Sequence, residues 1–292
     1  MNTGAILDAA HNNGARMTNR SLLLSVCLWS LITIAGAAQV KEPPAASDAY
    51  GGFGLPDQQG ARLLLMPDLA RPDLLKTALC AGGRTVPVHF ERRQGQTANN
   101  GRQATANFDK LAGNVFAIVG GKVDSETPCF LASETLLAAN TVLSIAVPQG
   151  SGACAQHSRF ATERDRPVIN CWPLARLSTD TQVGLLEFER HGKDALAALV
   201  LVAGTRSVYL DYPAEYKAKG ESLWRVDDDG KFSPDGIKVI CALQRGSVYT
   251  IGTGWDGAEG KLLQLWTSDG HDRFTKLLND YWYQAPTAPE RR

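Results

Sequence analysis

The residues that most suggest chemistry in this chain are aromatic side chains in its C-terminal part, with acidic residues interleaved among them. The aromatic residues are Tyr209, Tyr212, Tyr216, Trp224, Tyr249, Trp255, Trp266, Phe274, Tyr281, Trp282 and Tyr283. Aromatic faces beside carboxylates suit sugar rings, and Tyr and Trp also concentrate in the centres of protein interfaces. We therefore predict a ligand-binding face formed by Trp255, Asp256, Glu259, Tyr281, Trp282 and Tyr283. The alternative is core packing, because β-sheets routinely bury large aromatics.

A pair of carboxylates offers the main alternative, which is catalysis. Glu187 and Glu189 lie two residues apart in an apolar run, so a strand would place both on one face. Two carboxylates about 5–9 Å apart can hydrolyse a glycosidic bond. Val183 and Leu185 would lie on the same face. The alternative to catalysis is therefore that this face packs in the core and that only its end, with the two glutamates, turns outward to solvent.

Other motifs do not meet the requirements of the chemistry they suggest. The glycines of 252–257 match dinucleotide-binding spacing, but the following residues predict a strand where a phosphate-binding helix is needed. The acidic run at 226–236 has Phe232 where a calcium-binding loop needs glycine. No two histidines lie three or four residues apart, and nothing fixes a histidine or an acid beside Ser151. We therefore predict no metal site, no cofactor and no serine-hydrolase site.

The N-terminal segment has the features of a secretory signal peptide. Arg16 and Arg20 precede a long apolar run at 21–38, which ends in the small residues of 35–37. A basic start, an apolar centre and a small-x-small end are the three parts of a cleavable signal. The sequence predicts a signal peptide over 1–37 and a protein that is periplasmic or secreted.

Two alternatives to a cleaved signal remain open. An uncleaved anchor needs about 20 apolar residues, and the run at 21–38 contains serines and is shorter. Lipid modification of Cys27 requires the cysteine to close the run, but Leu28–Ile34 continue it. No later stretch approaches the length needed to span a membrane, so we expect no stable span after cleavage.

Cysteine usage agrees with an oxidising compartment. Five cysteines follow the signal, and we predict a disulfide between Cys154 and Cys171, across a polar stretch that resembles a loop. Cys80 and Cys129 form the second predicted pair. Cys241 lies in an apolar run and is expected to be a buried free thiol.

The elements that position these residues are predicted to be mostly strands. Short apolar runs rich in β-branched and aromatic residues alternate with Gly, Asp and Asn turns. The clearest runs are 61–66, 84–92, 114–120, 141–147, 167–172, 183–190, 195–202, 206–212, 222–226, 236–243, 247–252 and 261–266. Hairpin turns are predicted at 191–194, 227–230 and 245–246. Short helices are predicted at 72–79 and 213–219, and the pattern of 273–283 fits either a helix or a strand.

This pattern predicts a mainly β or α+β fold with antiparallel, sandwich- or barrel-like sheets and one to three short helices. We expect a flexible lead-in over 38–58, a β-rich subdomain over 59–150 and another over 165–286, which together form either two subdomains or one continuous domain. The segment at 94–110 is polar and is expected to be a surface loop.

The charge balance excludes a class of partners. Lys and Arg together number 30, as do Asp and Glu, whereas nucleic-acid binders carry a basic excess, so we expect no nucleic acid partner. The favoured function is non-catalytic binding of a cell-envelope glycan or a protein partner by an exported, soluble protein. The alternatives are a secreted hydrolase acting on glycan or peptide and a structural envelope component.

Overall fold

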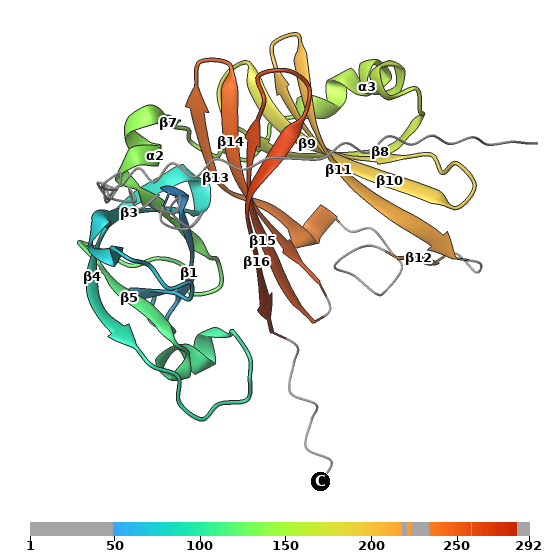
Figure 1. Cartoon of the computed structure of the whole chain (residues 1–292). Helices are drawn as coiled ribbons and strands as arrows, with labels where there is room; N and C mark the ends of the chain where they lie inside the picture. The colour runs from blue at the N-terminus through green and yellow to red at the C-terminus, as the bar shows by residue number, and fades with distance from the viewer. Residues whose placement is uncertain (1–48, 218–220, 224–233, 258, 285–292) are drawn as a thin grey trace, which may run out of the picture. The chain divides into compact units, whose positions relative to one another are not determined.

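The first part of the fold is a closed barrel of six antiparallel strands. The computed structural model describes residues 49–217, 221–223, 234–257 and 259–284. The barrel strands are β1 (Gly51–Pro56), β2 (Arg62–Leu65), β3 (Leu75–Cys80), β4 (Arg84–Gln94), β5 (Gly113–Ile118) and β6 (Cys129–Ser133). They follow the order β1-β2-β5-β4-β3-β6, and β6 pairs back onto β1 to close the barrel. Figure 1 shows these strands in blue to green.

Two open antiparallel sheets of five strands follow the barrel along the chain. The second sheet contains β8 (Val168–Arg176), β9 (Thr181–Phe188), β10 (Asp194–Ala203), β11 (Arg206–Lys217) and β12 (Glu221–Leu223), in the order β12-β11-β10-β9-β8. The central sheet contains β7 (Thr141–Val142), β13 (Ile237–Arg245), β14 (Val248–Asp256), β15 (Gly260–Ser268) and β16 (Phe274–Tyr283), in the order β16-β15-β14-β13-β7. The antiparallel, mainly β prediction is confirmed.

The central sheet is buried on both faces. On one face, Leu263 and Leu265 pack with Phe53 and Phe130 of the barrel. On the other face, Ile251 and the neighbouring apolar residues of β14 pack with those of β9, β10 and β11. Because side chains alternate along a strand, one strand of this sheet supplies both cores.

Helices are few and short among the described residues. α2 (Glu134–Ala139) begins at Ser133, whose hydroxyl accepts a hydrogen bond from the Leu136 N–H, and α3 (His157–Arg164) packs on the second sheet through Phe160. The 3₁₀ turns are η1 (Pro72–Leu74), η2 (Ala81–Gly83), η3 (Thr105–Lys110), η4 (Gly152–Gln156) and η5 (Pro234–Gly236). No helix in the described part of the chain is long and apolar enough to cross a membrane.

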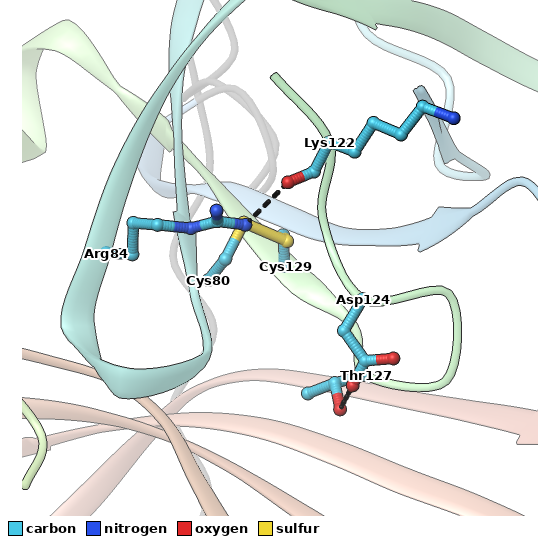
Figure 2. Close-up of a disulfide and its surroundings, with 6 residues drawn as sticks. All are labelled: Cys80, Arg84, Lys122, Asp124, Thr127 and Cys129. Carbon is cyan, nitrogen blue, oxygen red and sulfur yellow. Dashed lines mark hydrogen bonds between the residues drawn. A yellow bond between two sulfur atoms is a disulfide. The ribbon is translucent and has the colours of Figure 1, made fainter. Parts of the chain in front are cut away.

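Both predicted disulfides are confirmed. Cys80 bonds to Cys129 across the neighbouring strands β3 and β6, and Cys154 bonds to Cys171 between η4 and β8. Figure 2 shows the first of these beside the loop before β6, where the Arg84 guanidinium donates to the Lys122 carbonyl. Cys241 is buried as a free thiol, as predicted, and burial raises its pKa to about 12.

Several predicted local structures are wrong. The segment 72–79 forms η1 and most of β3, because Leu75 and Ala78 must bury inside the barrel and Cys80 must reach Cys129. The segment 213–217 continues strand β11 and pairs with β10, and 218–220 lie outside the described residues. The stretch between Cys154 and Cys171, interpreted as a loop, contains α3.

The flexible lead-in predicted for 38–58 is wrong for residues 51–56, which form the buried strand β1. Its glycines allow this burial: a Cβ at Gly52 would lie 2.7 Å from the Leu65 side chain. The predicted signal peptide, 1–37, lies outside the described residues, as do the hairpin turn at 227–230 and most of the acidic run at 226–236. The predicted boundary region, 148–166, contains η4 and α3. Strand β7, which precedes this region in the chain, belongs to the central sheet.

Candidate functional site

The structure does not bring the six predicted binding residues together: they lie on both faces of the central sheet and, for Glu259, just before strand β15. Trp255 and Tyr281 lie on the face toward the second sheet, where both stand opposite Leu262 in the strand register. Asp256 and Trp282 lie on the opposite face, where both stand opposite Lys261. Because consecutive residues of a strand point to opposite faces, Trp282 cannot share a face with its neighbour Tyr281.

The residues on the barrel side have structural partners. The Trp282 side chain is 1% exposed and packs in the core between barrel and sheet, while its indole N–H donates to the Asp280 carboxylate at 2.9 Å. Asp256 stands between the ammonium groups of Lys238, at 3.6 Å, and Lys261, at 3.2 Å. Trp282 is therefore part of the core, and Asp256 forms ion pairs with two lysines at this end of the sheet.

The remaining predicted residues are exposed. Tyr281 and Tyr283 on β16 have exposed fractions of 45% and 39%. Glu259 is exposed in the turn before β15, where its carbonyl accepts from the Gln284 N–H.

Trp255 lines a pocket on the face toward the second sheet. The pocket lies between β11 and the strands β14 and β15. Its cavity volume is about 80 Å³, and about 430 Å³ when the open solvent at its mouth is included. It is lined by Asp211, Tyr212, Pro213, Trp255, Leu262, Gln264 and Trp266. We call it the aromatic pocket. Its size suits one ring or one side chain.

Aromatic rings form the walls of this pocket. The Tyr212 and Trp255 rings meet edge to face with their centroids 4.9 Å apart, so each holds the other in place. The Trp266 indole N–H donates to the Thr253 hydroxyl at 3.3 Å, which fixes the plane of that ring. The Lys276 ammonium stands 5.8 Å from the Trp266 ring. The walls are therefore oriented before any ligand enters.

Asp211, the acidic residue among those that line the pocket, borders it with its main chain and not with its carboxylate. Tyr212 packs in the core between the sheets, so the adjacent Asp211 side chain points to the other face of β11. There the Asp211 carboxylate accepts from the Arg164 guanidinium at 2.5 Å. The Tyr209 N–H donates to the Asp272 carbonyl at the outer edge of β11, and the Asp211 N–H points toward the same edge.

The two glutamates considered for catalysis do not meet at this pocket. Glu187 lies at the end of β9, where its carboxylate accepts from the Asn170 amide at 2.7 Å. Glu189 follows the strand, is exposed, and its N–H donates to the Pro167 carbonyl. The hydrolase hypothesis stays a prediction.

The glycines at 252–254 have a packing role. A Cβ at Gly252 would lie 2.5 Å from the Cys241 sulfur and 3.5 Å from the Phe53 ring of the barrel. A Cβ at Gly254 would lie 3.2 Å from Ile240. Both glycines belong to strand β14, where Gly252 allows the barrel to approach the sheet closely and Gly254 leaves room for Ile240 of the neighbouring strand.

Comparisons with protein-family models, with curated proteins and with solved structures find no match to this chain. No set of three or more His, Cys, Asp or Glu side chains in the described part of the chain is arranged to hold a metal ion.

Gln264 is the pocket residue that sequence reasoning missed. It stands between Leu262 and Trp266 on one face of β15, and it is only 4% exposed. The available signal was a polar residue at a core position of an alternating run, which in a folded protein requires a hydrogen-bonding partner. Tyr212 and Trp266 belong to the group of aromatic residues noted in the C-terminal part of the sequence, but their sequence positions did not show that they line the same pocket.

Proposed function

We propose that this protein is exported and binds one sugar unit of a cell-envelope glycan in the aromatic pocket, without catalysis. The convergence of Tyr212, Trp255 and Trp266 around a space that suits one ring carries this proposal. Sugar rings present C–H faces that stack on aromatic side chains and hydroxyls that hydrogen-bond to polar groups. Gln264 and the edge of β11 supply such polar groups beside the aromatic walls.

Export is supported by the leader and by the disulfides. A basic, apolar and small-residue pattern precedes the mature region, which contains two disulfides. Disulfides persist in oxidising compartments, such as the periplasm or the extracellular space. A glycan of the cell envelope is a ligand that a protein in either place would meet.

Binding without catalysis is supported by the charges around the pocket. Hydrolysis of a glycosidic bond commonly requires two carboxylates that flank the bond. Asp211 is the acidic residue among those lining the pocket, and its carboxylate pairs with Arg164 on the opposite face of β11. The side chains that line the pocket therefore favour holding a ring over cleaving it.

A titration with envelope glycans tests this proposal. We expect soluble fragments of the bacterial cell wall to change the tryptophan fluorescence of the purified protein in a saturable way. Replacing Trp266 with alanine should weaken binding at least about tenfold, because a stacking wall is lost. The matched control is Tyr283→Ala, which removes an exposed aromatic of the same sheet outside the pocket and should leave affinity unchanged. Equal affinity of the Trp266 variant, or no binding of any glycan, contradicts the proposal.

A protein partner is the second candidate, and the exposure of Tyr281 and Tyr283 favours it. Both lie on β16, the edge strand of the central sheet, and exposed tyrosines are frequent in protein interfaces. A cross-linking experiment with envelope extract separates the two candidates. Loss of a cross-linked partner in a Tyr281→Ala, Tyr283→Ala double variant, with retention in Trp266→Ala, would support the protein partner.

A further inference from the structure

A buried glutamine stands among the aromatic walls of the pocket, and the following inference about it rests on the proposed function. Gln264 lies opposite Thr253 of β14 and Asn279 of β16, so the three side chains form a polar row across the central sheet. Gln264 is 4% exposed. Its amide must therefore satisfy both its donor and its acceptor inside the protein or with a ligand.

The neighbours of Gln264 fix the orientation of its amide. The Lys276 ammonium donates to the Oδ1 atom of Asn279 at 3.5 Å, and an ammonium has only donors. The atom of Asn279 that faces Gln264 is the same Oδ1, so Gln264 must present its Nε2 there, at 2.7 Å. The Oε1 atom of Gln264 is consequently turned away from Asn279.

This oxygen accepts no hydrogen bond from the described residues. Some side-chain atoms of the described residues are fully buried and lack a partner, and Gln264 Oε1 is not one of them. Since it has no partner, it must border open space. The open space that Gln264 lines is the aromatic pocket. A nearly buried acceptor in the wall of a pocket is suited to a ligand that donates a hydrogen bond.

The other polar groups of the pocket are uncharged. The Tyr212 hydroxyl forms no hydrogen bond with the described residues, and burial raises the pKa of this phenol, so it remains protonated at neutral pH. The Asp211 carboxylate is held by Arg164 on the other face of β11. The side chains that line the pocket therefore offer one acceptor, Gln264 Oε1, and one hydroxyl. The Lys276 ammonium, 5.8 Å from the Trp266 ring, is bound to the Oδ1 atom of Asn279 and is not among the lining groups.

We propose that Gln264 determines specificity: the aromatic pocket selects an uncharged sugar that donates an O–H or N–H to Gln264 Oε1, and it rejects sugars that carry a carboxylate. A carboxylate at this position would place two acceptors against each other and would lose its hydration without a cation in return. Asn279 acts as a positioning residue, because it holds the amide with its oxygen toward the ligand.

Calorimetric titration of the full purified protein with three single sugars tests this inference. Glucose and N-acetylglucosamine are the uncharged probes, and glucuronic acid is the matched acidic probe. We expect one or both uncharged sugars to bind, and glucuronic acid to bind at least about tenfold more weakly than the better of them. Glucuronic acid binding as tightly as the better uncharged sugar overturns the inference but leaves the proposed function intact. No binding of any envelope glycan overturns both.

Two variants separate a role in specificity from a role in folding. Gln264→Leu keeps the side-chain size and removes the acceptor, so it should lower affinity for the uncharged sugar about tenfold.

Asn279→Ala leaves Gln264 in place but frees its amide to turn, so the preference against glucuronic acid should decrease as Nε2 becomes able to face a carboxylate. A merely structural role would not change this preference. Unchanged affinity in Gln264→Leu, or an unchanged preference in Asn279→Ala, contradicts the inference, and the second test stands if the first variant does not fold.

Discussion

The two faces of the central sheet are built from the same strands but differ in what they leave for function. Toward the barrel, Leu263 and Leu265 are fully buried, and Gly252 lets Phe53 approach the sheet. Toward the second sheet, Gln264 and Trp266 occupy the intervening positions of β15 and border a pocket. Alternation along one strand can therefore place a closely packed core on one face of a sheet and an open pocket on the other.

The difference between the two faces of the central sheet has a geometric origin. Gly252 of β14 places no side chain on the barrel face, so Phe53 of the barrel packs closely against the sheet there. On the other face, β11 is joined to the central sheet near Tyr209, whose N–H donates to the Asp272 carbonyl. Farther along β11, large aromatic side chains meet edge to face and leave space beside them.

The largest expected effect comes from the tryptophan on the barrel face. Trp282→Ala removes a side chain that is 1% exposed, together with its hydrogen bond to Asp280, so it should lower the free energy of unfolding by about 4 kcal/mol. The matched variant on the other face is Trp266→Ala, which removes a half-buried ring and should cost about 1 kcal/mol. Urea unfolding followed by circular dichroism measures both. Similar losses in the two variants would contradict the division of roles between the faces.

A smaller effect is expected at the glycine that lets the barrel approach. Gly252→Ala places a methyl group 2.5 Å from the Cys241 sulfur, so it should lower the free energy of unfolding by about 2 kcal/mol through overpacking. The control is the double variant Gly252→Ala, Cys241→Ala, which vacates the space of the thiol and should recover part of the loss. Thermal unfolding of the three variants measures the coupling. A wild-type melting temperature in the single variant would show that the barrel can shift away from the sheet.

The sequence predicts the strands and the disulfides more reliably than it predicts the site. Alternation and turn residues located most strands, and the turns at 191–194 and 245–246 connect β9 to β10 and β13 to β14, as expected. The segment 273–283 remained ambiguous, and without knowing that it is a strand, the opposite faces of Tyr281 and Trp282 could not be assigned.

The pocket required information that no local pattern contains. Gln264 stands opposite Asn279 in the pairing of β15 with β16. A β-bulge at Leu277 of β16, opposite Leu265 and Trp266, shifts the rest of the register, so the pairing depends on the whole hairpin. Tyr212 reaches Trp255 only after the second sheet packs onto the central one. Tertiary packing also converted the predicted helix at 72–79 into a strand, because the barrel needs β3 to close between β4 and β6.

The smallest expected effect concerns the carboxyl group of the barrel face, Asp280. Burial raises the pKa of Asp280, although the hydrogen bond from the Trp282 indole N–H opposes this shift. The folded protein then holds a proton on Asp280 over a pH range in which the unfolded chain has released it, so stability falls as pH rises through that range. Asp280→Asn cannot ionise and should be more stable than the wild type at pH 7. The difference should disappear below about pH 3, where Asp280 is protonated in both states.

Asp124 provides a control with the opposite sign. The Thr127 hydroxyl and the Glu126 N–H donate to its carboxylate and lower its pKa, so Asp124→Asn should be less stable than the wild type at pH 7 (Figure 2). That deficit should close as pH falls through the folded-state pKa of Asp124, because protonation removes the advantage of the charged form. Urea unfolding at pH 7 and pH 3 measures both variants. A loss of stability at pH 7 in Asp280→Asn would mean that the hydrogen bond from Trp282 to the charged carboxylate outweighs the cost of its burial, and that the barrel face also tolerates a charge.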